Sequence, residues 1–131
     1  MAGVRHGFAD AAKARRSIEM VVCVPVAMEG MIDPRWGRAD RVAIAEVTGD
    51  GIAAWQEFDV GWSTLHDAGT EGSHHARVAR FLQEHHVEAV VANHMGMPMV
   101  HMLERMGMKV WLGAMGDARQ ATMTAIDSEP N

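Results

Sequence analysis

The chain has 131 residues, of which 48% are hydrophobic and 22% are charged, and its formal net charge is −5. This composition is typical of one globular domain, and the acidic balance argues against sequence-independent nucleic-acid binding, which depends on Lys and Arg. Because no apolar run approaches the ~18 residues that cross a bilayer and no signal-peptide pattern is present, we expect a cytoplasmic protein without a membrane partner.

The first predicted strand covers residues 20–26, a continuous apolar run that contains Cys23, the only cysteine of the chain. Such a run is typical of a strand buried on both faces, so we expect it at the centre of a sheet. A single cysteine excludes an intramolecular disulfide framework and a cysteine-rich zinc site. Residues 1–18 are predicted to be a flexible extension, residues 19–127 the folded domain, and residues 128–131 a frayed tail.

A β-hairpin is predicted next, from residues 42–47 and 52–58, because Asp50-Gly51 suits the positive φ values of a tight turn. Residues 59–72 are predicted to form a long polar loop, and long loops in compact domains are often functional. We then expect Ser73 to cap a helix. Its apolar face is predicted to contain Val78, Phe81, Leu82 and His85.

The remaining elements alternate between strand and helix. Residues 87–92 form an apolar strand, and Pro98 suits the start of the following helix, which Gly107 ends. Residues 109–112 form a further strand, and Asp117 is expected to cap a last helix. This alternation implies parallel strands with helical crossovers, so we predict a five-stranded mixed α/β sheet with helices on its faces.

Imidazole and thioether groups are concentrated in the second half of the chain. Seven of the eight His lie between His66 and His101, and the chain has 12 Met. His94, Met95 and Gly96 follow the predicted strand directly, at the sheet edge where open α/β folds bind ligands. These groups suit a soft or borderline metal, or an anionic metal–sulfur cluster, better than a nucleotide.

Four segments, in order along the chain, resemble one known family. They are the loop at 33–39, which contains Trp36-Gly37-Arg38-Ala39, the helix entry at 71–77, the strand and turn at 87–99, and the loop at 113–118. Together they are similar to the dinitrogenase iron–molybdenum cofactor biosynthesis family, which includes NifX, NafY and the C-terminal part of NifB. Trp36 stands where this family usually has Phe, and Met97 where many members have Pro.

The resemblance implies a ribonuclease-H-like three-layer α/β fold, with strand order 3-2-1-4-5 and strand 2 antiparallel to the rest. It also implies binding or carriage of an iron–sulfur or iron–molybdenum–sulfur cluster without catalysis. Proteins that donate and accept the cluster are then the expected partners.

A site for such a cluster would draw on several loops. Arg38 is the expected counter-charge, because a guanidinium offers several N–H donors to an anion. Gly72 and Gly96 lack a Cβ, which would allow the backbone to approach a bulky ligand closely. Met95 is the expected neighbour of the cluster beside Gly96, and Met99 is a weaker candidate because it also begins the apolar face of its helix.

His75 and His94 are the expected metal ligands, since imidazole is a common ligand and both residues adjoin the predicted sheet edge. Of the adjacent pair His74 and His75, we expect only one to reach that edge, because neighbours on a helix point about 100° apart. We expect His85 and His86 to be structural, His101 to be exposed, and leave His66 unassigned.

Two alternatives stay open at this point. One is a mononuclear soft-metal site, for copper, made by the His and Met side chains. The other is a regulatory or interaction domain that binds no cluster. A nuclease is disfavoured, because two-metal phosphodiester chemistry needs several carboxylates and residues 21–26 contain none.

Overall fold

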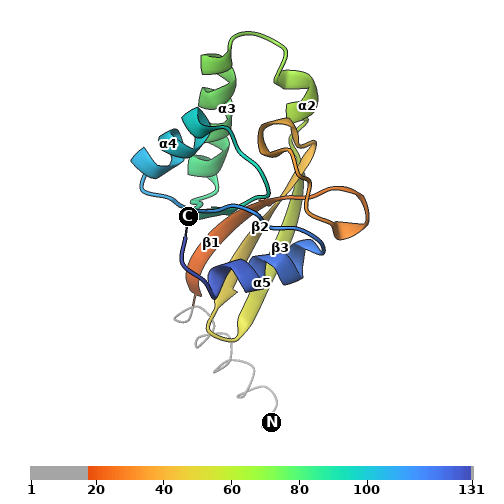
Figure 1. Ribbon diagram of the computed structural model, residues 1–131, viewed down its shortest axis with the longest axis vertical. Helices are drawn as coiled ribbons and strands as arrows, with labels where there is room; N and C mark the ends of the chain where they lie inside the picture. The colour runs from red at the N-terminus through yellow and green to blue at the C-terminus, as the bar shows by residue number, and fades with distance from the viewer. Residues whose placement is uncertain (1–17, 131) are drawn as a thin grey trace, which may run out of the picture.

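The strand that contains Cys23 is the centre of the molecule. The computed structural model describes residues 18–130 and places β1 (Ile18–Pro25) in the middle of a five-stranded sheet, in the order β3-β2-β1-β4-β5 (Figure 1). β2 (Arg41–Thr48) pairs with β1 in antiparallel fashion, and β4 (Ala89–Val91) pairs with it in parallel. Cys23 is fully buried. The predicted strand order and the central position of the first strand are confirmed.

The predicted hairpin is present at one edge of the sheet. β3 (Gly51–Asp59) is antiparallel to β2, and Gly51 has a φ of 125°, which favours glycine. The Thr48 hydroxyl accepts a hydrogen bond from the Asp50 N–H at 3.1 Å and so closes the turn. At the other edge, β5 (Lys109–Trp111) is parallel to β4.

Helices cover both faces of the sheet and complete the predicted three-layer, ribonuclease-H-like fold. α3 (Glu71–Glu84) and α4 (Met97–Arg105) pack on one face, against side chains that include Cys23 and Val90. α5 (Ala118–Ile126) packs on the opposite face (Figure 1). That second core contains, among others, Val22, Val24, Ala89 and Val91. Alternate residues of β1 and β4 therefore enter different cores, which explains why both strands are apolar throughout.

The start of α3 and the loop before it differ from the prediction. Thr70, not Ser73, is the N-cap of α3, and the two residues form a capping box with N···O distances of 3.0 and 3.1 Å. The loop predicted at 59–72 is also interrupted, because α2 (Trp62–Leu65) forms within it and buries the Trp62 side chain.

The helix predicted to begin at Pro98 begins one residue earlier. Gly96 is the N-cap of α4 and Met97 is its first residue, so Pro98 occupies the second position, where its missing N–H still costs no helical hydrogen bond. Gly107 ends the helix as predicted, with a φ of 85°. Asp117 caps α5 as predicted, since its side chain accepts the Gln120 N–H at 2.9 Å.

The predicted flexible extension at 1–18 lies, apart from Ile18, outside the described residues. Within the described range of 18–130, no helix is long and apolar enough to cross a membrane.

Candidate functional site

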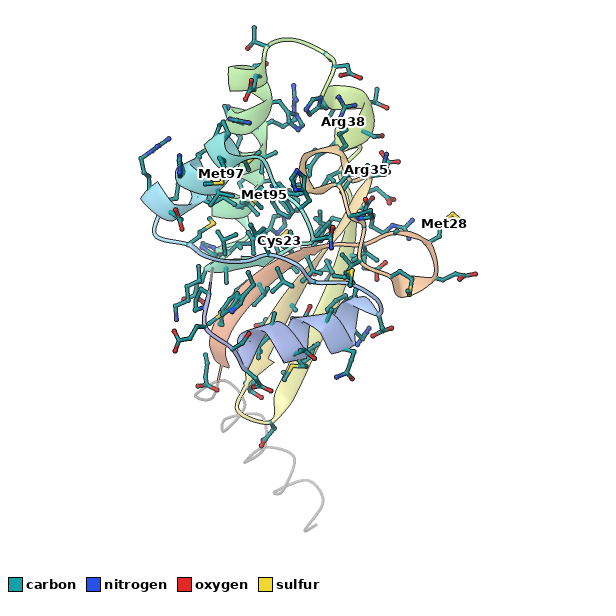
Figure 2. The ribbon with its side chains drawn as sticks, viewed as in Figure 1. Cys23, Met28, Arg35, Arg38, Met95 and Met97 are labelled. Carbon is teal, nitrogen blue, oxygen red and sulfur yellow. The ribbon has the colours of Figure 1, made fainter. Side chains whose placement is uncertain are left out.

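A pocket of about 530 Å³ opens beside the carboxyl ends of β1 and β4, where ligands bind in open α/β sheets. Three segments line it: the loop after β1, the α2–α3 region and the loop that leads into α4. Figure 2 shows Arg35 and Arg38 on the first of these segments and Met95 on the last. The lining residues are Pro34, Arg35, Trp36, Gly37, Arg38, His66, Glu71, His74, His75, His94, Met95, Gly96, Pro98 and Met99.

Backbone contacts hold the first and last of these loops together. Arg35 and His94 form an isolated parallel bridge, although they are far apart in the sequence. Buried Asp33 fixes the approach to this bridge, because its carboxylate accepts the Arg35 N–H at 2.9 Å. On the other side, the Asn93 amide donates to the Ala114 carbonyl at 3.1 Å. The position of His94 is therefore set by hydrogen bonds on both sides of it.

Most of the residues predicted for the site line this one pocket. They are Arg38, His75, His94, Met95 and Gly96, and the weaker candidate Met99 also belongs to the lining. Gly72 is not among the lining residues and lies on the exposed first turn of α3. His94 is exposed, whereas Met95 is buried.

Two arginines place positive charge at the pocket. The Arg38 side chain is 46% exposed and its guanidinium lies 3.5 Å from the Asp67 carboxylate. A hydrogen bond from His66 and the charge of Arg38 lower the pKa of Asp67, so this carboxylate is ionised at neutral pH. Arg35, 62% exposed, pairs with Asp33 at 3.4 Å. The sequence did not indicate that Arg35 lines the pocket, because its proximity to His94 depends on the backbone bridge between the two loops.

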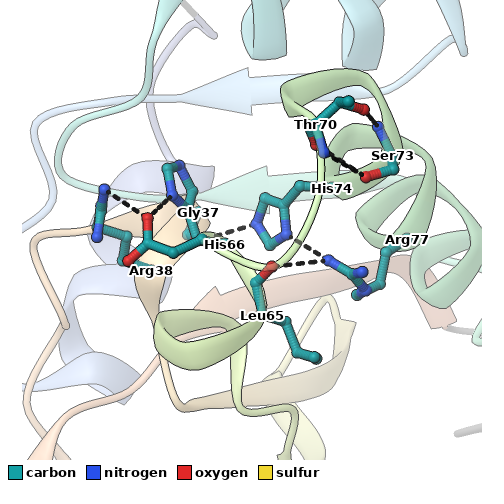
Figure 3. Close-up of polar contacts among 9 residues, drawn as sticks. Gly37, Arg38, Leu65, His66, Thr70, Ser73, His74 and Arg77 are labelled. Atoms are coloured by element: carbon teal, nitrogen blue, oxygen red, sulfur yellow. Dashed lines mark hydrogen bonds and ion pairs between the residues drawn. The ribbon is translucent and has the colours of Figure 1, made fainter.

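His74 holds two sides of the pocket together (Figure 3). Its Nε2 lies 2.8 Å from the Gly37 carbonyl oxygen, and its Nδ1 lies 2.9 Å from the Arg77 guanidinium, which also donates to the Leu65 carbonyl. Arginine can only donate, so Nδ1 accepts and Nε2 carries the proton that is donated to Gly37. Burial lowers the pKa of His74, although the hydrogen bond to Gly37 opposes this effect.

The expectation that only one of His74 and His75 would reach the site is wrong, because the pocket extends around the N-terminal end of α3 and both side chains line it. They are not equivalent, however. Both ring nitrogens of His74 have protein partners, whereas His75 is partly exposed and lies 3.7 Å from Glu71 in an exposed i,i+4 pair. His74 precedes Val78 by four residues, a spacing that places it on the buried helix face and could have indicated its burial.

Three of the other histidines among residues 18–130 lie outside the pocket. His85 packs against the rings of Phe58 and Phe81, at centroid distances of 4.6 and 4.4 Å. His86 is exposed and has a φ of 57° just after α3 ends, and His101 is exposed on α4. His66, unassigned from the sequence, lines the pocket with its ring 5.0 Å from that of His74.

The usual metal-ligating side chains are not gathered at one point among the residues that the structure describes. Among residues 18–130, no three His, Cys, Asp or Glu side chains are grouped closely enough to hold a metal ion. Burial in the sheet raises the pKa of the Cys23 thiol, so this cysteine stays protonated. Iron–sulfur clusters are commonly held by Cys thiolates, which this buried cysteine cannot supply, so a cluster in this pocket would depend on imidazole ligands and on charge compensation.

Comparison with solved structures supports the fold. No curated protein matches the sequence. Among solved structures, the apo form of the orange protein from Desulfovibrio gigas is 22% identical, with a TM-score of 0.65 over 88% of this chain and 98% of that one. A putative NifB protein from Thermotoga is 20% identical, with a TM-score of 0.64 over 83% and 89%. At these identities, the structural matches establish the fold alone.

The family comparison covers most of the chain. The model of the family described as dinitrogenase iron-molybdenum cofactor matches residues 20–128, which include all strands and helices from β2 to α5 and nearly all of β1. The chain therefore belongs to the dinitrogenase iron–molybdenum cofactor family.

Proposed function

We propose that the protein binds an anionic iron–sulfur or iron–molybdenum–sulfur cluster in this pocket and carries it as cargo, as an accessory to cofactor assembly and without catalysis. Membership of a family associated with iron–molybdenum cofactor biosynthesis supports this proposal. The observation that carries it is the combination at one pocket of two guanidinium groups, exposed imidazole and thioether sulfur, with no close group of three His, Cys, Asp or Glu side chains among residues 18–130.

Each group has a distinct proposed part in holding the cluster. Arg38 and Arg35 offset the negative charge, since guanidinium groups present several N–H donors to an anion. His94 and His75 are the proposed metal ligands. Gly96, the N-cap of α4, lets the backbone approach the cluster, and Met95 contributes a polarisable wall. Gly72 is not part of the proposed site.

The exposure of the site suits a cargo that is later released. His94 is exposed, and the Arg35 and Arg38 side chains are 62% and 46% exposed. A resident cofactor is usually enclosed more completely by its protein. We therefore propose that one protein donates the cluster to this pocket and another accepts it.

Anaerobic titration tests the proposal with two probes, a reconstituted [4Fe–4S] cluster and tetrathiomolybdate, a soluble molybdenum–sulfur anion. We expect saturable binding of at least one probe, followed by its charge-transfer absorption. Copper(I) under the same conditions is the comparison. Tight binding of copper(I) with no binding of either probe would show that the pocket is a mononuclear metal site instead.

A further inference from the structure

Trp36 is one of the residues that line the pocket, and it is almost completely buried. Trp36 begins the short 3-10 turn η2 (Trp36–Arg38), two residues before Arg38, and its side chain is 2% exposed. Its ring packs edge-on against Trp62, with centroids 5.3 Å apart and an interplanar angle of 70°. Trp36 therefore belongs both to the hydrophobic core and to the residues that line the pocket.

The polar atom of this ring has no partner. Among the side chains that the structure describes, Trp36 Nε1 is the one buried nitrogen or oxygen for which no hydrogen bond is made. Other tryptophans of the chain differ, because Trp111 Nε1 donates to the Ser128 carbonyl at 3.1 Å and Trp55 Nε1 donates to Glu57 at 3.0 Å. A buried N–H without an acceptor is unfavourable and uncommon, and a ligand in the adjoining pocket can supply the missing acceptor.

We propose that Trp36 Nε1 donates a hydrogen bond to a sulfide or oxo atom of the bound cluster. The inference rests on the proposed function and names one atom of the protein that recognises the cargo. An indole N–H is a donor only, so it cannot ligate a metal cation. It favours a ligand that presents an anionic sulfur or oxygen, and it therefore selects a metal–sulfur cluster over a bare copper ion.

Trp36→Phe is the direct test, since it keeps an aromatic ring and removes the N–H. In the ligand-free protein this change leaves a smaller ring in the core but removes an unpaired donor, so we expect the melting temperature to fall less than it does when a hydrogen-bonded tryptophan is replaced. Binding of the [4Fe–4S] cluster or tetrathiomolybdate should become about tenfold weaker, because a hydrogen bond to a charged acceptor is lost.

Trp111→Phe is the matched control. Trp111 is buried on the opposite face of the sheet, does not line the pocket, and its N–H already has an acceptor. The same substitution there should lower the melting temperature and leave probe affinity unchanged. Trp111→Phe is thus expected to lose more stability, and Trp36→Phe to lose more affinity for the probe.

The indole N–H resonances give a direct readout, because the chain has four tryptophans and Trp36→Phe assigns one signal. We expect the Trp36 signal to move downfield and to exchange more slowly with solvent when the probe is added. Equal probe affinity of Trp36→Phe and wild type would overturn the inference while cluster binding stands. A fall in melting temperature as large as that of Trp111→Phe would also overturn it, since the N–H would then have an acceptor within the ligand-free protein. Failure of the wild type to bind either probe would overturn the proposed function and this inference together.

Discussion

At the scale of single residues, Arg38 is the clearest case of a side chain whose charge matters to the ligand more than to the fold. Its ion pair with Asp67 is exposed on both sides, and such pairs contribute little to stability. We expect Arg38→Glu to leave the melting temperature nearly unchanged and to weaken cluster binding roughly tenfold or more, because repulsion replaces attraction. Anaerobic titration and thermal unfolding measure the two effects.

Arg41→Glu is the control for this prediction. Arg41 also forms exposed ion pairs, with Asp59 at 3.0 Å and Glu57 at 3.7 Å, but it does not line the pocket. The same charge reversal there should leave affinity intact. If Arg38→Glu and Arg41→Glu bind the cluster equally well, Arg38 has no part in the site.

The histidine prediction concerns the proposed metal ligands. We expect His94→Ala or His75→Ala to abolish the charge-transfer absorption of the bound cluster while the far-UV circular dichroism is unchanged, because both side chains line the pocket without a role in the core. His86→Ala and His101→Ala are suitable controls, since both residues are exposed and outside the pocket. Unchanged absorption in all four variants would mean that histidine does not ligate the cluster.

His85→Ala, by contrast, is not a suitable control, because we expect it to destabilise the fold. Its contacts with two phenylalanine rings mean that His85→Ala would remove aromatic packing, at a cost of about 1 kcal/mol in the free energy of unfolding. The helical spacing predicted this packing, because His85 lies four residues after Phe81.

At the scale of elements, Gly96→Ala at the start of α4 tests whether the cluster approaches the backbone there, and we expect the fold to tolerate this substitution. Gly96 has a φ of −65°, and a Cβ added there would meet only the Pro98 ring, at 3.9 Å. Gly96→Ala should therefore alter the free energy of unfolding by no more than about 1 kcal/mol. If the cluster approaches the backbone here, the added methyl group will reduce affinity, and unchanged affinity would place the cluster elsewhere in the pocket.

His74, which joins α3 to the turn at Gly37, predicts that the stability of the protein depends on pH. Burial lowers the pKa of His74 below the ordinary value near 6.5, while Arg77, His66 and His75 add positive charge nearby. The unfolded chain then binds a proton at a higher pH than the folded protein, so His74 makes the protein less stable as pH falls below about 6.5. His74→Gln keeps a donor and an acceptor but does not titrate, and unfolding measured between pH 7 and 5 should show a smaller loss than wild type. An identical pH profile would contradict this account.

Most helices and strands could be predicted from the sequence, because the patterns that favour them involve residues close together in the chain. The apolar run of β1, the Asp50-Gly51 turn and the Asp117 cap each depend on a few adjacent residues. The errors also have local causes, since Thr70 and Ser73 both carry hydroxyl groups that can cap a helix. The roles of Arg35 and His74 could not be predicted from such signals alone, because they depend on partners 59 positions away at His94 and 37 positions away at Gly37.

At the scale of the whole molecule, the sheet explains why the site lies where it does. β1 and β4 are parallel and adjacent, so the loops that follow them meet at one edge, and α3 and α4 enclose that edge on one face. The chain carries a net charge of −5, yet two arginines stand at this pocket. Each of them pairs with a carboxylate, so the pocket offers two guanidinium donors to an anionic cluster without giving this acidic chain a general affinity for nucleic acids.

The most direct measurement of the central claim is elemental analysis of the protein purified anaerobically from its native host. We predict iron or molybdenum together with acid-labile sulfide, in fixed proportion to each other and at lower content in the Arg38→Glu variant. Copper without sulfide, or protein free of metal and sulfide throughout purification, would contradict the account.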